Sequence, residues 1–82
     1  MNILTVLNAV SSTEPSTFNE FCRALGGDCP ERGDREAWAD LFDTVNAAET
    51  LNLIAVDRLN GRIETLILTG SGAERVGEAQ RR

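Results

Sequence analysis

Histidine, lysine and tyrosine are all missing from this chain of 82 residues, and cysteine occurs only twice. Without these side chains the protein lacks most of the general bases that work near neutral pH, so the sequence predicts no catalytic residues and no enzyme. Two thiols without any imidazole also argue against a structural zinc site, and we expect no metal or cofactor. No apolar run approaches the ~20 residues of a membrane-spanning helix, so we expect no membrane partner and a cytoplasmic location.

The composition that remains is that of one small, acidic globular domain. Hydrophobic residues make up 41% of the chain, which supplies a core of modest size at this length. We expect one domain over residues 1–76 and a polar tail that frays over residues 77–82. A homodimer would bury additional surface and so support so small a domain. The formal net charge is −5, and all eight basic residues are arginines. Such a chain has no long-range attraction for a polyanion. Its acidity would also suit a high-salt cytoplasm, in which long-range charge effects are largely screened.

Two cysteines are interpreted as free thiols. Cys22 falls on the apolar face of a predicted helix, where a thiol behaves as a small hydrophobe, and Cys29 falls in a polar loop. The apolar run near the N-terminus lacks the basic leader and cleavage site of a signal peptide. A disulfide is therefore the less favoured alternative.

The clearest structural signal is Asn60-Gly61, which separates two short apolar runs within residues 51–68. Both residues tolerate positive φ angles, and Asn-Gly is the strongest short-range signal for a β-hairpin with a two-residue loop. A three-residue loop beginning at Leu59 is the alternative, because a two-residue loop would set Asp57 opposite Glu64. Either loop predicts a two-stranded hairpin.

Helical patterns occupy the chain before this hairpin. Residues 2–10 favour a first helix over a strand, because their apolar residues do not alternate. Thr17, with a glutamate three residues later, forms a capping box for a second helix that ends at Gly26-Gly27. Asp34 can cap a third helix that runs to about Thr50.

Turn-forming residues separate the predicted helices. Residues 11–16 read as a break, and 28–33 read as a loop in which one helical turn could begin at Pro30. After the hairpin, Thr69 can cap a short final helix that extends through Val76. The predicted order is therefore three helices, a hairpin and a fourth, short helix.

This order of elements resembles the winged helix-turn-helix domains of small prokaryotic and viral transcription regulators. Residues 17–26 are similar to their second helix, and 48–54 to the junction between recognition helix and first wing strand. Leu68-Thr69, followed by Gly72 and Val76, is similar to the Leu-Thr-x-x-Gly exit from the wing. The resemblance implies a mainly α, α+β fold with three helices, a two-stranded wing and a short C-terminal helix or tail. One departure is the long connection between the second and third helices.

By this resemblance the chain would bind duplex DNA, with the third helix in the major groove and the wing on the backbone or minor groove. The candidate contacts precede the third helix, begin it or flank the wing turn, and they are Arg32, Arg35, Arg58, Asn60 and Arg62. Two guanidiniums at the wing tip could straddle a phosphate. In the plainer interpretation they keep the hairpin soluble and offset neighbouring carboxylates.

Charges on the third helix favour a different partner. At about 100° per residue, the face opposite the apolar stripe carries Glu36, Asp40 and Asp43. These carboxylates would repel the phosphates on both sides of a groove. The alternative function is an acidic winged-helix module, such as a viral or plasmid-encoded inhibitor or adaptor, that docks on a basic protein surface. Leu4 or Val6 of the first helix could supply a homodimer contact. The stripe itself, which we expect in the core, is Trp38, Leu41, Phe42, Val45 and Ala48.

Overall fold

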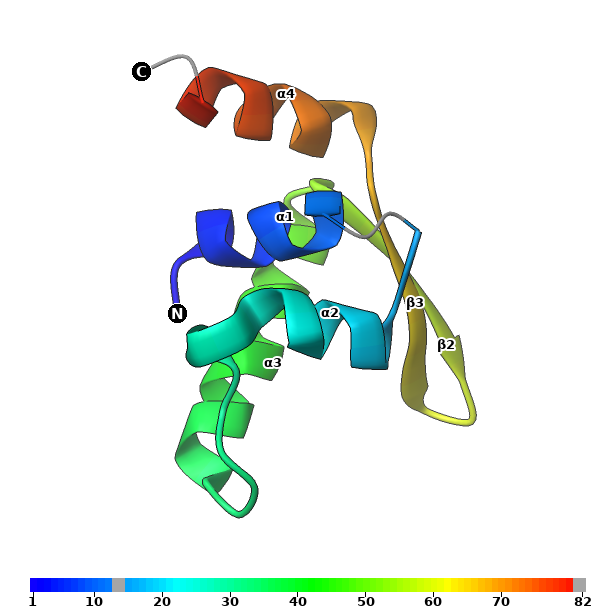
Figure 1. Ribbon diagram of the computed structural model, residues 1–82. Helices are drawn as coiled ribbons and strands as arrows, with labels where there is room; N and C mark the ends of the chain where they lie inside the picture. Colours follow the sequence, from blue (N-terminus) through cyan, green and yellow to red (C-terminus); the bar gives the residue numbers. More distant parts are fainter. Residues whose placement is uncertain (13–14, 81–82) are drawn as a thin grey trace.

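A computed structural model of the protein describes residues 1–12 and 15–80. Its elements are α1 (Ile3–Ser12), β1 (Ser16–Thr17), α2 (Phe18–Leu25), a 3-10 turn η1 (Gly26–Asp28), α3 (Arg35–Thr50), β2 (Ile54–Leu59), β3 (Arg62–Leu68) and α4 (Gly70–Gln80). Within these residues, three α-helices precede an antiparallel hairpin and a fourth follows it (Figure 1), which confirms the predicted α+β class. Residues 13–14 of the predicted break, and residues 81–82, lie outside the described residues. The rest of the break at 11–16 is not as predicted, because Ser11 and Ser12 continue α1 and Ser16 begins β1.

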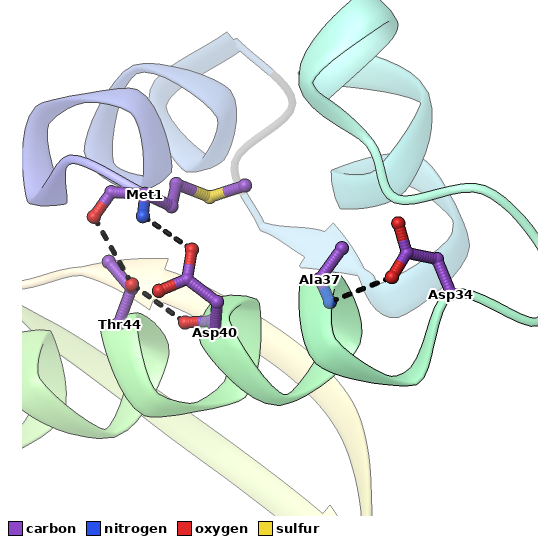
Figure 2. A network of polar contacts seen from close by, with 5 residues as sticks. All are labelled: Met1, Asp34, Ala37, Asp40 and Thr44. Carbon is purple, nitrogen blue, oxygen red and sulfur yellow. Dashed lines mark hydrogen bonds and ion pairs between the residues drawn. The ribbon is translucent and has the colours of Figure 1, made fainter.

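The starts of α2 and α3 follow from their sequences. The Glu20 amide donates to the Thr17 hydroxyl at 3.2 Å, and the Thr17 amide donates back to the Glu20 carboxylate at 3.4 Å. This reciprocal pair is the predicted capping box. Asp34 caps α3 by accepting a hydrogen bond from the Ala37 amide at 3.2 Å (Figure 2). Both predicted N-caps are confirmed, because each depends only on residues within one turn.

The end of α2 differs from the prediction in one detail. Gly26 has a φ of +56° and ends the α-helix, as expected for a glycine in this position. The chain then tightens into η1, and the Cys29 amide donates to the Gly26 carbonyl at 3.1 Å. The extra helical turn therefore lies immediately after α2, not at Pro30, because the glycine pair lets the chain continue into a tighter turn.

A double hydrogen bond closes the C-terminus of α3 at the predicted residue. The Leu53 amide donates to the Ala48 carbonyl at 2.9 Å, and the Asn52 amide donates to the Glu49 carbonyl at 3.0 Å. Asn52 takes the left-handed conformation, with φ +60°. This is a Schellman motif in which asparagine occupies the position usually held by glycine.

The hairpin has the predicted two-residue turn. Asn60 and Gly61 both have positive φ angles, of 53° and 78°, and the flanking Leu59 and Arg62 pair directly. A bulge follows, in which Glu64 is the extra residue between the pairs Arg58–Ile63 and Asp57–Thr65. The expected opposition of Asp57 and Glu64 is therefore wrong. The Asp57 carboxylate instead accepts a hydrogen bond from the Thr65 hydroxyl at 3.2 Å.

The sequence does not predict β1, the short strand that pairs with β3. Ser16 faces Leu66 and Thr17 faces Thr65, so the three strands lie in the order β1-β3-β2. Ser16 is completely buried, and its hydroxyl donates to the Val10 carbonyl in the last turn of α1 at 3.3 Å. A two-residue strand has no alternation to detect, because its partner lies about fifty residues away in the chain.

Helix α4 begins as predicted but extends to Gln80 instead of ending at Val76. The Thr69 hydroxyl caps it by accepting a hydrogen bond from the Gly72 amide at 3.1 Å. Residues 77–80, expected to fray, remain helical because α4 packs along α1 (Figure 1), with Val76 buried between them and the sheet. None of the helices in the described part of the chain has the length and apolarity of a membrane-spanning helix.

One core is shared by all four helices and the sheet. Its fully buried side chains include Val6, Leu7, Val10, Phe21, Leu41, Val45, Ile54 and Leu66. Val6 is thus unavailable for the homodimer contact that we considered for it, and Leu4 is half-buried beside Arg75 and Ala79 of α4. The predicted stripe of α3 is correct except at Phe42, which is 40% exposed, and Trp38 is half-buried.

Candidate functional site

The β2–β3 hairpin is tied to the C-terminal half of α3 by one arginine. Arg58 of β2 donates through Nη1 to Glu49 Oε2 at 2.9 Å and through Nη2 to Glu49 Oε1 at 2.8 Å. Its Nη2 also donates to Asn46 Oδ1 at 3.4 Å. A two-pronged guanidinium–carboxylate pair has a defined geometry as well as charge attraction. The pair therefore orients the hairpin relative to α3 and compensates the charge of Arg58.

Arg58 and Glu49 shift each other's pKa. The hydrogen bond from Arg58, with a smaller contribution from its charge, lowers the pKa of Glu49 below its ordinary value of 4.5. Glu49 in turn raises the pKa of Arg58. Sequence reasoning missed Glu49 and Asn46 because both look like ordinary solvated positions of a helix. Their role follows from where the hairpin returns against α3.

We expect acid to open this pair. A carboxylate whose pKa is lowered by folding contributes stability above its unfolded pKa, and that contribution is lost as pH falls through the folded-state pKa. The Arg58–Glu49 pair should therefore be intact at neutral pH and open only below about pH 4.5. In Arg58→Gln, carbon-detected NMR titration should show the pKa of Glu49 rising to its ordinary value. Arg62→Gln is the matched control and should leave it unchanged; an unmoved pKa in Arg58→Gln contradicts the pairing.

The predicted contact residues separate into two groups. Arg58, Asn60 and Arg62 are all exposed on the hairpin, which extends past the helices (Figure 1). Arg32 is exposed in the loop before α3, and Arg35 is exposed at its first residue. That loop lies well away from the wing tip (Figure 1). Within residues 1–12 and 15–80, Arg32, Arg35 and Arg62 form no ion pair.

The carboxylates expected on the outer face of α3 are exposed. Glu36, Asp40 and Asp43 all reach solvent, which leaves an acidic ridge along the helix. Asp40 forms an ion pair with the Met1 amino group (Figure 2), and Thr44 donates to the Asp40 carbonyl at 2.8 Å. The acidic ridge therefore borders the N-terminus of α1, whereas Asn46 and Glu49 border the hairpin.

An aromatic cluster lies between α2 and α3. The rings of Phe18 and Phe42 stack with centroids 5.9 Å apart, and Trp38 lies 6.1 Å from Phe42. The Trp38 indole donates to the Glu31 carbonyl at 3.1 Å, which anchors the loop before α3. Phe42 remains 40% exposed despite these contacts. Its spacing within the apolar stripe does not reveal this exposure, because the stripe wraps around the helix towards the wing.

Both cysteines are free thiols, as the sequence indicates. Burial raises the pKa of Cys22 to about 11, and the neighbouring Cys29 thiol adds to the shift through its charge and a hydrogen bond. Such a thiol carries little thiolate at neutral pH, so Cys22 is poorly reactive. In the part of the chain that the structure describes, no three histidine, cysteine, aspartate or glutamate side chains are grouped to hold a metal ion.

Comparison with known proteins identifies no relative. No protein-family model, no curated protein and no solved structure matches this chain significantly. A functional assignment therefore depends on the topology and on the side chains described above.

Proposed function

We propose that this protein is a winged helix-turn-helix regulator of transcription that binds duplex DNA through α3 and the wing. The observation that carries the proposal is the topology. Three helices are followed by a hairpin whose strand β3 pairs with β1, and the hairpin is held beside the solvent-facing side of α3. In helix-turn-helix proteins the corresponding helix enters the major groove.

The distribution of arginines supports contact with the DNA backbone. Arg62 at the wing tip and Arg32 and Arg35 near the start of α3 are exposed and form no ion pair among the described residues. Guanidiniums at two separated positions suit phosphates on either side of a groove. Because the chain is acidic overall, we expect binding that is weak and strongly dependent on salt.

Titration of a fluorescent duplex at low salt tests the proposal. The logarithm of the affinity should fall linearly with the logarithm of salt concentration, because each phosphate contact releases counterions. Arg62→Gln should weaken binding on every sequence alike and reduce the salt slope by about 1. Arg75→Gln, which removes an exposed arginine from α4, is the matched control and should leave the slope unchanged. Absence of affinity even at low salt contradicts DNA binding.

A second function is supported by the acidic ridge. Glu36, Asp40 and Asp43 are exposed side by side on α3, the helix that would have to approach phosphates. We propose as the alternative that this ridge docks on a basic protein surface, as in an inhibitor or adaptor protein. In that case neutralising the ridge abolishes the contact, whereas it improves binding to DNA.

A further inference from the structure

A cleft of about 450 Å³ opens between the start of α2, the middle of α3 and the tip of the wing. Phe18, Phe42 and Ile63 form its apolar lining, and Asn46, Arg58 and Arg62 contribute polar groups. These residues come from α2, α3 and the two strands of the hairpin, three parts of the chain that are well separated in the sequence. The cleft is therefore a product of the fold, and it lies next to the proposed DNA-binding surface.

The aromatic lining provides a preformed stacking surface. Phe42 is 40% exposed, yet its ring is braced by Phe18, with centroids 5.9 Å apart and planes inclined by 12°, and by Trp38. An exposed ring held in this way loses little conformational freedom when a ligand covers it. Nucleic-acid bases stack readily on such rings, whatever their sequence.

The polar lining adds a positive charge and hydrogen-bonding groups. Arg62 forms no ion pair within the described residues, so its guanidinium is available to an anion. Arg58 is held by Glu49, and its Nη2 donates to Asn46 Oδ1, which orients the Asn46 amide. Asparagine amides can pair with the edge of an adenine. The cleft thus combines an aromatic face, an amide and an uncompensated guanidinium.

We propose that this cleft binds one unpaired nucleotide of a DNA strand, with the base on Phe42 and the phosphate at Arg62. A carboxylate side chain would satisfy Arg62 but leave the ring exposed, and an apolar side chain would cover the ring but leave the guanidinium without an anion. A nucleotide joins a flat ring system to a phosphate and matches both. The inference rests on the proposed DNA binding and names its substrate, a duplex with a single-stranded end or gap.

Three otherwise identical DNA ligands test this inference on the unaltered protein. The first is a blunt duplex, and the second is the same duplex with a three-nucleotide overhang. The third is the same duplex with an overhang built from abasic nucleotides. The overhang is placed at the 5′ end in one series and at the 3′ end in another. We expect the natural overhang to bind roughly tenfold more tightly than the blunt duplex, and the abasic overhang to lose most of that gain. Quenching of Trp38 fluorescence should accompany only the natural overhang, since Trp38 lies 6.1 Å from Phe42. Equal affinity for natural and abasic overhangs overturns the inference.

Two variants separate the base from the phosphate. Phe42→Leu should abolish the gain that the overhang gives over the blunt duplex, whereas Arg62→Gln should weaken binding of all three ligands. Leu51→Ala removes an exposed apolar side chain outside the cleft and should retain the gain. Thermal unfolding checks that Phe42→Leu is folded. If it is not, the comparison of natural and abasic overhangs on the unaltered protein tests the inference.

The outcomes for this inference and for duplex binding are distinguishable. Blunt-duplex binding without any gain from an overhang overturns the nucleotide site and leaves the proposed regulator intact. Binding of the duplex with the natural overhang, without binding of the blunt duplex, supports the nucleotide site and overturns the proposed regulator. If neither ligand binds at low salt, both are overturned.

Discussion

Replacing Gly72 with alanine should destabilise the protein severely. A Cβ atom at this position would lie 1.9 Å from the carbonyl oxygen of Leu53 and 2.9 Å from its carbonyl carbon. Both atoms belong to the backbone of the turn after α3, and hydrogen bonds hold this turn in place. The Leu53 carbonyl accepts a hydrogen bond from the Thr69 amide at 3.1 Å, and the Thr69 hydroxyl donates to the Asn52 carbonyl. Either α4 must move away from the turn after α3, or that turn must open.

The expected cost is about 3 kcal/mol or more, at the upper end of what overpacking produces, because backbone and not side-chain atoms obstruct the methyl group. That is a large fraction of the ~5–15 kcal/mol typical of a whole domain. Denaturant unfolding followed by circular dichroism measures it. The close approach also explains why glycine stands at position 72, because α4 crosses the turn after α3 at this residue.

Gly77→Ala on the same helix is the matched control. A Cβ atom there would meet no heavy atom within 4 Å, and alanine favours a helix interior over glycine by ~1 kcal/mol. This substitution should therefore stabilise the protein slightly. Equal effects of the two substitutions would contradict the packing of α4 against Leu53.

Neutralising the acidic ridge should change binding more than any other surface substitution. In Glu36→Gln/Asp40→Asn/Asp43→Asn, three exposed carboxylates disappear from the helix expected to approach phosphates. We expect DNA affinity to rise by roughly tenfold or more at low salt, with the gain shrinking as added salt screens the remaining charges. If the ridge instead docks on a basic protein, the same variant should lose that contact.

A control variant tests whether the position of the charges matters. Asp28→Asn/Glu74→Gln/Glu78→Gln removes the same number of exposed carboxylates from η1 and α4. Its DNA affinity should rise much less, because those charges lie off α3. Thermal unfolding of the ridge variant checks that losing the Met1–Asp40 pair leaves the fold intact. Equal gains in both variants would mean that net charge alone, not α3, governs binding.

Local signals predicted most of the elements. The capping box at Thr17, the cap at Asp34 and the turn at Asn60-Gly61 each depend on residues within one helical or β-turn, and each is present in the structure. The predictions missed β1, the bulge at Glu64 and the last turn of α4, and they placed the extra helical turn at Pro30 instead of at η1. Strand β1 and the last turn of α4 depend on partners distant in the chain, and the bulge depends on how the two strands of the hairpin pair, so no capping or turn signal contains the cause.

The candidate site was only partly visible in the sequence. The acidic ridge follows from helical periodicity, and the exposed arginines of the wing follow from their position beside a turn. The capture of Arg58 by Glu49 does not, because it requires the hairpin to fold back on α3 with a bulge that turns the strand. The exposure of Phe42 has the same origin, since the cleft exists only once α2, α3 and the wing have packed.

By itself, the sequence determined where helices begin, where the hairpin turns and which side of α3 carries carboxylates, because capping, positive φ angles and periodicity act over a few residues. Tertiary structure decided which arginine pairs with Glu49, which aromatic ring meets solvent and why position 72 has room only for glycine. These three features depend on contacts between segments that are distant in the sequence. Such contacts form only when the core packs and excludes water.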